Sequence, residues 1–245
     1  MSDVGPLARS PVPVGEPAGI AHGWQISARR SHADLRLADS TASVKALVRA
    51  EPRGAMAERL GVRVGHAVRT GEPFAEPGSA KRAADLRPKS FAEPGPAKRA
   101  DDLRPQDVLM CRFGPGEWLA MATLDRRASM WGHLRTLAAD ADELVSLIDV
   151  THGRVVLRLT GARAAITLSK ICGIDLRDDV TPDGAALRTS VAALVTDIVR
   201  NDVDGQRSYL LGCEWSSGQY LWDAVLEAGA EFGIDVDGLD GTRGI

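Results

Sequence analysis

The chain has 245 residues, with 30 Lys and Arg against 33 Asp and Glu, and a formal charge of −3. This balance excludes the clustered positive charge that nucleic-acid binding needs, and it is too mild to indicate an acidic tail or a polybasic membrane patch. Apolar residues make up 44% of the sequence, which is enough for a buried core, and the length fits one large domain or two small ones.

The N-terminal region is rich in Pro and Gly, which predicts a flexible arm over residues 1–23. It holds no apolar stretch of the signal-peptide type, and no window approaches the ~18 apolar residues of a spanning helix, so we expect a cytoplasmic protein. Cys111, Cys172 and Cys213 lie far apart and predict neither a disulfide framework nor a CxxC metal pair. We expect each to be a small buried hydrophobic residue.

The main domain is expected over 24–236, in two halves at about 42–150 and 151–236, with a C-terminal tail over 237–245. Apolar alternation, Pro and Gly predict the following elements for the first half: a strand over 42–50, a helix over 52–60, a hairpin of strands 108–113 and 117–122, a helix capped by Asp125 and carrying Met130, Leu134 and Leu137, and a strand over 144–150. This order, β-α-β-β-α-β, is that of the ferredoxin-like split unit.

A duplicated segment interrupts the first half. FAEPGSAKRAADLRPKS (74–90) is followed directly by FAEPGPAKRADDLRPQD (91–107). Two short copies cannot form a solenoid, because at least three repeats are normally needed to bury a continuous face. We interpret residues 74–107 as a solvated loop inserted between core elements. The functional alternative is a docking peptide that displays Lys81-Arg82 and Lys98-Arg99.

The second half repeats the same order without its last strand. The predicted elements are a strand over 153–160, a helix over 162–171, a polar loop over 175–184, a hairpin of strands 187–200 and 207–213, and a helix capped by Ser216-Ser217 that ends near Phe232. The predicted fold class is therefore α+β, with two ferredoxin-like halves whose sheets are covered by helices on one face.

Catalytic signatures are absent from the sequence, which has no phosphate-binding loop, GxGxxG, HExxH or GxSxG motif. Asp149 and His152 could form a proton-transfer pair, or both could hydrogen-bond the backbone at a turn. Asp197 lies inside the apolar run ALVTDIVR. Strand alternation favours an outward-facing carboxylate there, whereas the alternative is a carboxylate that points into a cleft and holds a cationic group of a substrate.

Three segments carry a resemblance to a known family: GPGEWLAMA (114–122), LIDVTHGRVVLRLTGARA (147–164) and QYLWDAVLEAGAEFGI (219–234). At these positions the sequence resembles the gamma subunit of heterotetrameric sarcosine oxidase and, through it, the folate-binding domain of the glycine-cleavage aminomethyltransferase. The resemblance covers roughly residues 35–72 and 107–236. The N-terminal arm and the duplicated insertion depart from the usual gamma pattern.

The resemblance implies an accessory subunit of a complex that oxidatively demethylates sarcosine to glycine. It further implies that FAD, FMN, NAD, tetrahydrofolate and zinc belong to the alpha, beta and delta partners, and that this chain itself binds no cofactor or metal. The alternative is a free-standing, folate-dependent one-carbon transferase. Its acid would be the aspartate of a D-D-L-[IV]-V stretch, which corresponds here to Asp197, although this sequence has Thr196 where the first carboxylate would stand.

The closing helix is the candidate partner surface. Leu221, Val225 and Phe232 form one apolar stripe, and Trp222 and Leu226 form a second stripe beside it. We predict that the second stripe meets the large flavoprotein subunit, because Trp is often an interface anchor. The alternative is that this chain buries the whole arc, with the N-terminal arm folded over it.

Overall fold

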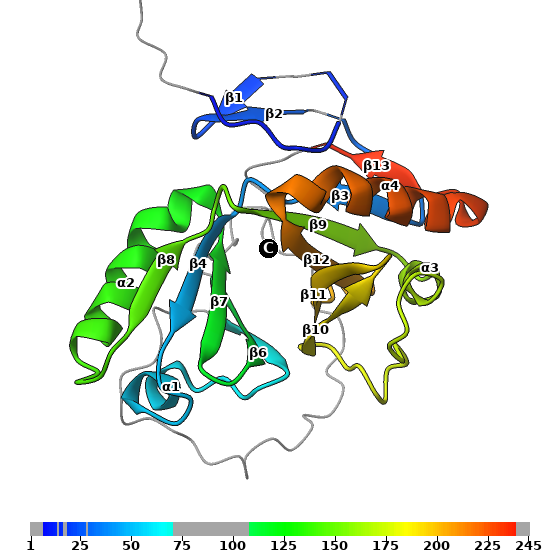
Figure 1. The fold of residues 1–245 in the computed structure, drawn as a ribbon. Helices are drawn as coiled ribbons and strands as arrows, with labels where there is room; N and C mark the ends of the chain where they lie inside the picture. The colour runs from blue at the N-terminus through cyan, green and yellow to red at the C-terminus, as the bar shows by residue number, and fades with distance from the viewer. Residues whose placement is uncertain (1–6, 14, 17–18, 28, 71–107, 239–245) are drawn as a thin grey trace, which may run out of the picture.

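The computed structural model describes residues 7–13, 15–16, 19–27, 29–70 and 108–238. The duplicated segment 74–107 and residues 239–245 of the predicted tail lie outside the described residues. The fold is α+β, as predicted: two large sheets stand side by side, with α2 beside one and α3 and α4 beside the other (Figure 1).

The first sheet has the order β5-β6-β7-β4-β8, and its pairings are all antiparallel. Its strands are β4 (Val44–Arg49), β5 (His66–Thr70), β6 (Val108–Gly114), β7 (Glu117–Ala122) and β8 (Ser146–Asp149). The order β8-β4-β7-β6 is the ferredoxin-like arrangement expected from the sequence. The edge strand β5 was not predicted, because it is a short segment with little alternation.

Two helices cover one face of this sheet. They are α1 (Ala55–Leu60) and α2 (Arg127–Ala139), and Met56, Met130 and Leu134 from them are buried against apolar residues of β4 and β7. The prediction that Asp125 caps α2 was wrong. A 3-10 turn, η2 (Leu124–Arg126), precedes the helix, so the first helical turn begins after Asp125 and receives no side-chain cap.

The second sheet has the order β10-β11-β12-β9-β3-β13. Its strands are β3 (Arg36–Asp39), β9 (Arg154–Thr160), β10 (Ala186–Val191), β11 (Leu194–Arg200), β12 (Ser208–Glu214) and β13 (Asp235–Asp237). The sequence predicts no last strand for this half. The structure supplies it from the N-terminal side: β3 pairs antiparallel with β9, and β13 adds to β3 in parallel.

Residues 187–200, predicted as a single strand, are instead a tight hairpin of β10 and β11. The turn lies at Ala192 and Ala193, which both have positive φ angles, of 48° and 66°. Positive φ at both central residues is typical of a type I′ turn, which normally uses Asn and Gly. Two alanines give no turn signal, which explains why the prediction ran through them.

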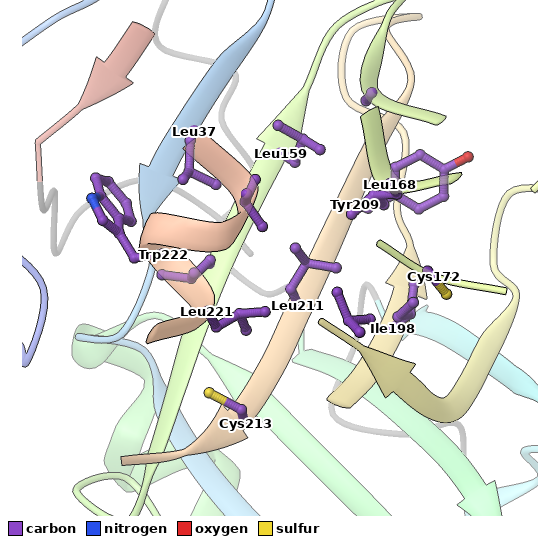
Figure 2. Packing of buried hydrophobic residues seen from close by; sticks show 14 of the residues in the cluster. Leu37, Leu159, Leu168, Cys172, Ile198, Tyr209, Leu211, Cys213, Leu221 and Trp222 are labelled. Atoms are coloured by element: carbon purple, nitrogen blue, oxygen red, sulfur yellow. The ribbon is translucent and has the colours of Figure 1, made fainter. Parts of the chain in front are cut away.

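Helices α3 (Ala164–Ser169) and α4 (Gly218–Gly229) cover the second sheet. Leu168, Leu221 and Trp222 of these helices belong to one buried cluster with Leu159 and Leu211 of the strands (Figure 2). The 3-10 turns η3 (Trp215–Ser217) and η4 (Ala230–Phe232) flank α4, and no side-chain cap comes from Ser217, contrary to the prediction. Among the described residues, no helix is long and apolar enough to cross a membrane.

The described part of the predicted N-terminal arm packs on the rest of the molecule. Strands β1 (Gly19–Ala21) and β2 (Trp24–Ile26) form a small hairpin, and Ala8 bridges to Trp24. Val12 is buried in the same core cluster as Trp222. The prediction of a flexible arm therefore differs from the structure at these residues, because Val12 packs in the core of the second half and Ala8 packs against the core of the first.

The faces of the two sheets that carry no helix pack against each other. A separate buried cluster joins them, built from Leu109, Cys111, Leu119 and Met121 of the first sheet and Val156, Val199 and Leu210 of the second. Backbone hydrogen bonds from Ala67 N to Gly184 O (2.7 Å) and from Ala186 N to Gly65 O (2.9 Å) link the sheets further. Strand residues on these faces are therefore buried where the two sheets touch.

Candidate functional site: a charged cleft between the sheets

A cleft of about 340 Å³ lies between the two sheets. Both sheets contribute apolar and charged side chains to its walls. The described residues that line the cleft are Leu47, Arg49, Glu117, Val150, Gly153, Arg154, Arg188, Val195 and Glu214. The volume is at the lower end of the range for small-molecule sites, roughly 300–1,000 Å³.

Asp197 lies beside this cleft and is only 3% exposed. One carboxylate oxygen accepts a hydrogen bond from Arg154 Nη2 (2.5 Å), and the other accepts one from Arg188 Nε (2.6 Å). Alternation correctly placed Asp197 on the opposite face from Ile198. The expectation that this face is solvent-exposed was wrong, because the other sheet covers it.

The ion pairs continue across the cleft to the first sheet. Arg188 Nη1 lies 2.8 Å from Glu117 Oε1, and Arg49 Nη2 lies 3.1 Å from Glu117 Oε2. Burial disfavours the charged form of Glu117, but its hydrogen bonds and ion pairs with Arg188 and Arg49 outweigh burial and lower the pKa of Glu117. The hydrogen bond to Asp197 is the main cause that raises the pKa of Arg188. Glu117 and Arg188 therefore remain charged near neutral pH, which makes Glu117 a poor proton acceptor and Arg188 a poor proton donor.

The family resemblance raises the question of whether this cleft fits a folate. None of the described lining residues is aromatic, and the three arginines that could stack on a pterin ring, Arg49, Arg154 and Arg188, are already held in ion pairs with carboxylates of this chain. The buried carboxylate, which would be the acid in a transferase, is already bound by two arginines of the same chain. The residues present thus do not fit a folate held for one-carbon transfer, and we derive no catalytic step through that cofactor.

Asp149 and His152 have different partners and do not form the proton-transfer pair that was considered. Asp149 Oδ1 accepts a hydrogen bond from Thr151 N (2.9 Å), and Arg127 Nη2 lies 2.5 Å from Asp149 Oδ2. The His152 ring stacks on Trp24, with ring centroids 5.0 Å apart. Asp149 therefore accepts a backbone hydrogen bond at the turn, as the alternative predicted, whereas His152 makes an aromatic contact with Trp24.

Trp222 is 2% exposed and belongs to the core of the second half. From the sequence, only the neighbouring stripe of Leu221, Val225 and Phe232 was expected in this core. Leu226 is partly buried against the same core. The burial of Trp222 matches the alternative in which the N-terminal segment folds over the helix, since Val12 lies in the same cluster. Of the two predicted interface residues, Trp222 and Leu226, it is Leu226 that keeps part of its surface exposed.

The described part of the chain contains neither a reactive cysteine nor a cluster of metal ligands. The three cysteines are free and buried, as predicted. Burial raises the pKa of Cys213 to about 11 and that of Cys111 further still, which disfavours reactive thiolates. No group of three or more His, Cys, Asp and Glu side chains in the described ranges could hold a metal ion.

Sequence reasoning missed the arginines that surround Asp197. A signal was present: Arg154, Val156 and Arg158 alternate in GRVVLRLT, so one face of β9 carries charges. A half-buried arginine on an interior strand needs an acid near it, and Asp197 supplies this acid for Arg154 from β11, two strands away in the same sheet.

Comparison with known proteins defines the family. Residues 103–244, more than half of the chain, match the family described as "GCVT N-terminal domain", and the chain belongs to it. An aminomethyltransferase from Geobacillus thermodenitrificans (strain NG80-2) is 33% identical over 103 residues, which span 42% of this chain and 28% of that protein. The match thus covers less than a third of the curated relative.

Two solved structures share the fold. A chain of the heterotetrameric sarcosine oxidase from Corynebacterium sp. U-96, in complex with pyrrole 2-carboxylate, has a TM-score of 0.58 at 19% identity, and the match covers 84% of this chain and 89% of that one. Glycine cleavage system aminomethyltransferase T from Bartonella henselae has a TM-score of 0.63 at 13% identity, with 95% and 60% covered. The resemblance predicted from the sequence is thus confirmed for the family and the fold.

Proposed function

We propose that this chain is a non-catalytic, accessory gamma-type subunit of a heterotetrameric sarcosine oxidase, which oxidatively demethylates sarcosine to glycine. The observation that carries the proposal is the burial of Asp197 and its ion pairs with two arginines. The acid that a transferase would use is buried and neutralised by Arg154 and Arg188. The similar extent of this chain and the sarcosine oxidase chain, 84% and 89% covered, supports the same conclusion.

In this proposal the chain has a structural role. The alpha, beta and delta subunits hold FAD, FMN, NAD, tetrahydrofolate and zinc, and this chain packs against the alpha subunit. We place the complex in the cytoplasm, where three buried cysteines without disulfides are expected to persist. The ion pairs from Asp197 to Glu117 would then serve to hold the two sheets together, rather than to move protons.

The test is to assemble the complex with the flavoprotein and zinc subunits of the same genome and to measure sarcosine turnover per assembled complex. Asp197→Asn should change the turnover number by no more than about twofold. Asp125→Asn, an exposed aspartate on the surface, is the matched control. Normalising to the intact complex separates turnover from any loss of assembly. A loss of ~10²-fold, the scale of a general acid–base group, would overturn the proposal.

The alternative is a folate-dependent, aminomethyltransferase-like one-carbon transfer protein, which the 33% identity to an aminomethyltransferase favours. Titration of the isolated chain with 5-formyltetrahydrofolate, followed by tryptophan fluorescence, distinguishes the two. The accessory role predicts no saturable binding below about 1 mM, since the described lining of the cleft has no aromatic side chain and its arginines are already ion-paired. A dissociation constant in the micromolar range would favour the transferase.

A further inference from the structure

A second cluster of arginines lies between the sheets, four residues along β9 from Arg154. Arg69 of β5 crosses from the first sheet to the second, where its Nε and Nη2 donate to Asn201 Oδ1 at 2.8 and 2.5 Å. Arg158 of β9 donates from Nη1 to Ser208 Oγ at 2.9 Å and to Asn201 O at 3.3 Å. Two guanidinium groups therefore share Asn201 as a common partner.

These two arginines lack the carboxylates that accompany Arg154 and Arg188. In the described part of the chain, neither Arg69 nor Arg158 forms an ion pair, and the hydrogen bonds of both go to neutral oxygens. Burial and the nearby charge of Arg69 lower the pKa of Arg158 to about 10. A largely buried cation beside a second cation is costly unless an anion compensates it.

The cluster also presents buried donors that no atom of the described residues accepts. Arg158 Nη2 and the amide nitrogen of Asn201, Nδ2, are both buried and have no hydrogen-bond partner. Asn201 is 4% exposed, and its orientation is defined because its oxygen accepts both bonds from Arg69. Most buried polar atoms in proteins have partners, so two unpartnered donors on neighbouring residues need an explanation. A water molecule could accept from them but would leave the charge of Arg158 uncompensated, whereas Arg69 is exposed to solvent.

We propose that Arg69, Arg158 and Asn201 form a binding site for a small oxyanion, a carboxylate or phosphate group, at the seam between the two sheets. The anion accepts hydrogen bonds from Arg158 Nη2 and Asn201 Nδ2 and compensates both guanidinium charges. Guanidinium and amide N–H groups suit an acceptor with two or more oxygens. The site is separate from the Asp197 cleft, where each arginine already has an acid, and the proposal does not depend on the accessory function.

The experiment is calorimetric titration of the full chain with inorganic phosphate and, in a second arm, with acetate, at ionic strength held constant with sodium chloride. We expect saturable binding of at least one anion, and the two arms distinguish phosphate from carboxylate. At ten times the dissociation constant, that anion should raise the melting midpoint by about 3–6 °C. Arg158→Gln should abolish both effects, whereas Arg177→Gln, a 70% exposed surface arginine, should preserve them.

Asn201→Asp keeps the test decisive if Arg158→Gln fails to fold. The substitution removes only an unpartnered donor and places a carboxylate between the two arginines, so it should raise the melting midpoint and abolish binding of the anion. The proposal is overturned if neither phosphate nor acetate binds the wild-type chain, if binding survives unchanged in Arg158→Gln, or if Asn201→Asp lowers the midpoint and still binds the anion.

Discussion

Lys45 should make the stability of this protein depend on pH in the alkaline range. Its side chain is fully buried, and Nζ donates to Thr41 O and Ser43 O, both at 2.7 Å. Burial lowers the pKa of Lys45 from 10.5 to about 7, and repulsion from Arg154 acts in the same direction, against the attraction of Asp39 and Asp149. The folded state therefore favours the neutral amine, which still has two N–H groups for the two carbonyl oxygens.

The sign of the effect follows from proton binding. Between pH 7 and 10.5 the unfolded chain holds a proton on Lys45 that the folded chain has released. The free energy of unfolding therefore rises with pH in this window, by up to ~1.4 kcal/mol per pH unit. Lys45→Met removes this dependence, so its stability relative to wild type should decrease steadily from pH 7 to 9.5. Loss of the cation also raises the pKa of buried Asp39 further, which changes the comparison in the same direction.

Urea unfolding followed by tryptophan fluorescence at several pH values measures this difference. Val44→Ala is the matched control, because it removes buried volume from the same strand but keeps Lys45. It should lower stability by a similar amount at every pH. If the difference between Lys45→Met and wild type stays constant within ~0.5 kcal/mol from pH 7 to 9.5, the assignment of the buried amine is wrong.

Three other predictions follow from the packing. Trp222→Ala should lower the free energy of unfolding by ~3–5 kcal/mol, and Leu226→Ala by clearly less; a loss below ~1 kcal/mol for Trp222→Ala would contradict its place in the core. Replacing Ala192-Ala193 by Asn-Gly should raise stability by ~1 kcal/mol in the same urea assay, since both residues have positive φ; a decrease would argue against the type I′ turn. Deleting 74–107 and joining Pro73 to Val108 by a short Gly-Ser bridge should change stability by ~1 kcal/mol or less, because Thr70 and Val108 are direct partners in the β5–β6 ladder; a loss of several kcal/mol would place the segment in the core.

Local patterns were sufficient to predict most of the first half. Alternation over 42–50 and the turn at Gly114-Pro115-Gly116 each determine a strand or a hairpin within a few residues, and the structure has β4, β6 and β7 there. The turn at Ala192-Ala193 escaped prediction because its geometry comes from the pairing of β10 with β11, whereas its residues carry no turn preference.

The candidate site shows where such reasoning stops. Period-two alternation gives the face on which Asp197 lies, but whether that face meets solvent depends on the other sheet, which is distant in sequence. The same limit applies to Trp222, since helical spacing cannot reveal that Val12 lies in the same cluster. Arg69 and Asn201 lie 132 residues apart, so no local signal connects them.

The position of β3 has a consequence for how the chain folds during synthesis. Residues 36–39 leave the ribosome early, yet their partner β9 at 154–160 is made more than a hundred residues later. In the interval the whole first sheet can form, because its strands β4 to β8 are complete by residue 149. The pairing of β3 with β9 is thus a late, long-range step, and such steps slow folding. A nascent chain should expose the unpaired edge of β3 until then, and unpaired strand edges are prone to aggregation.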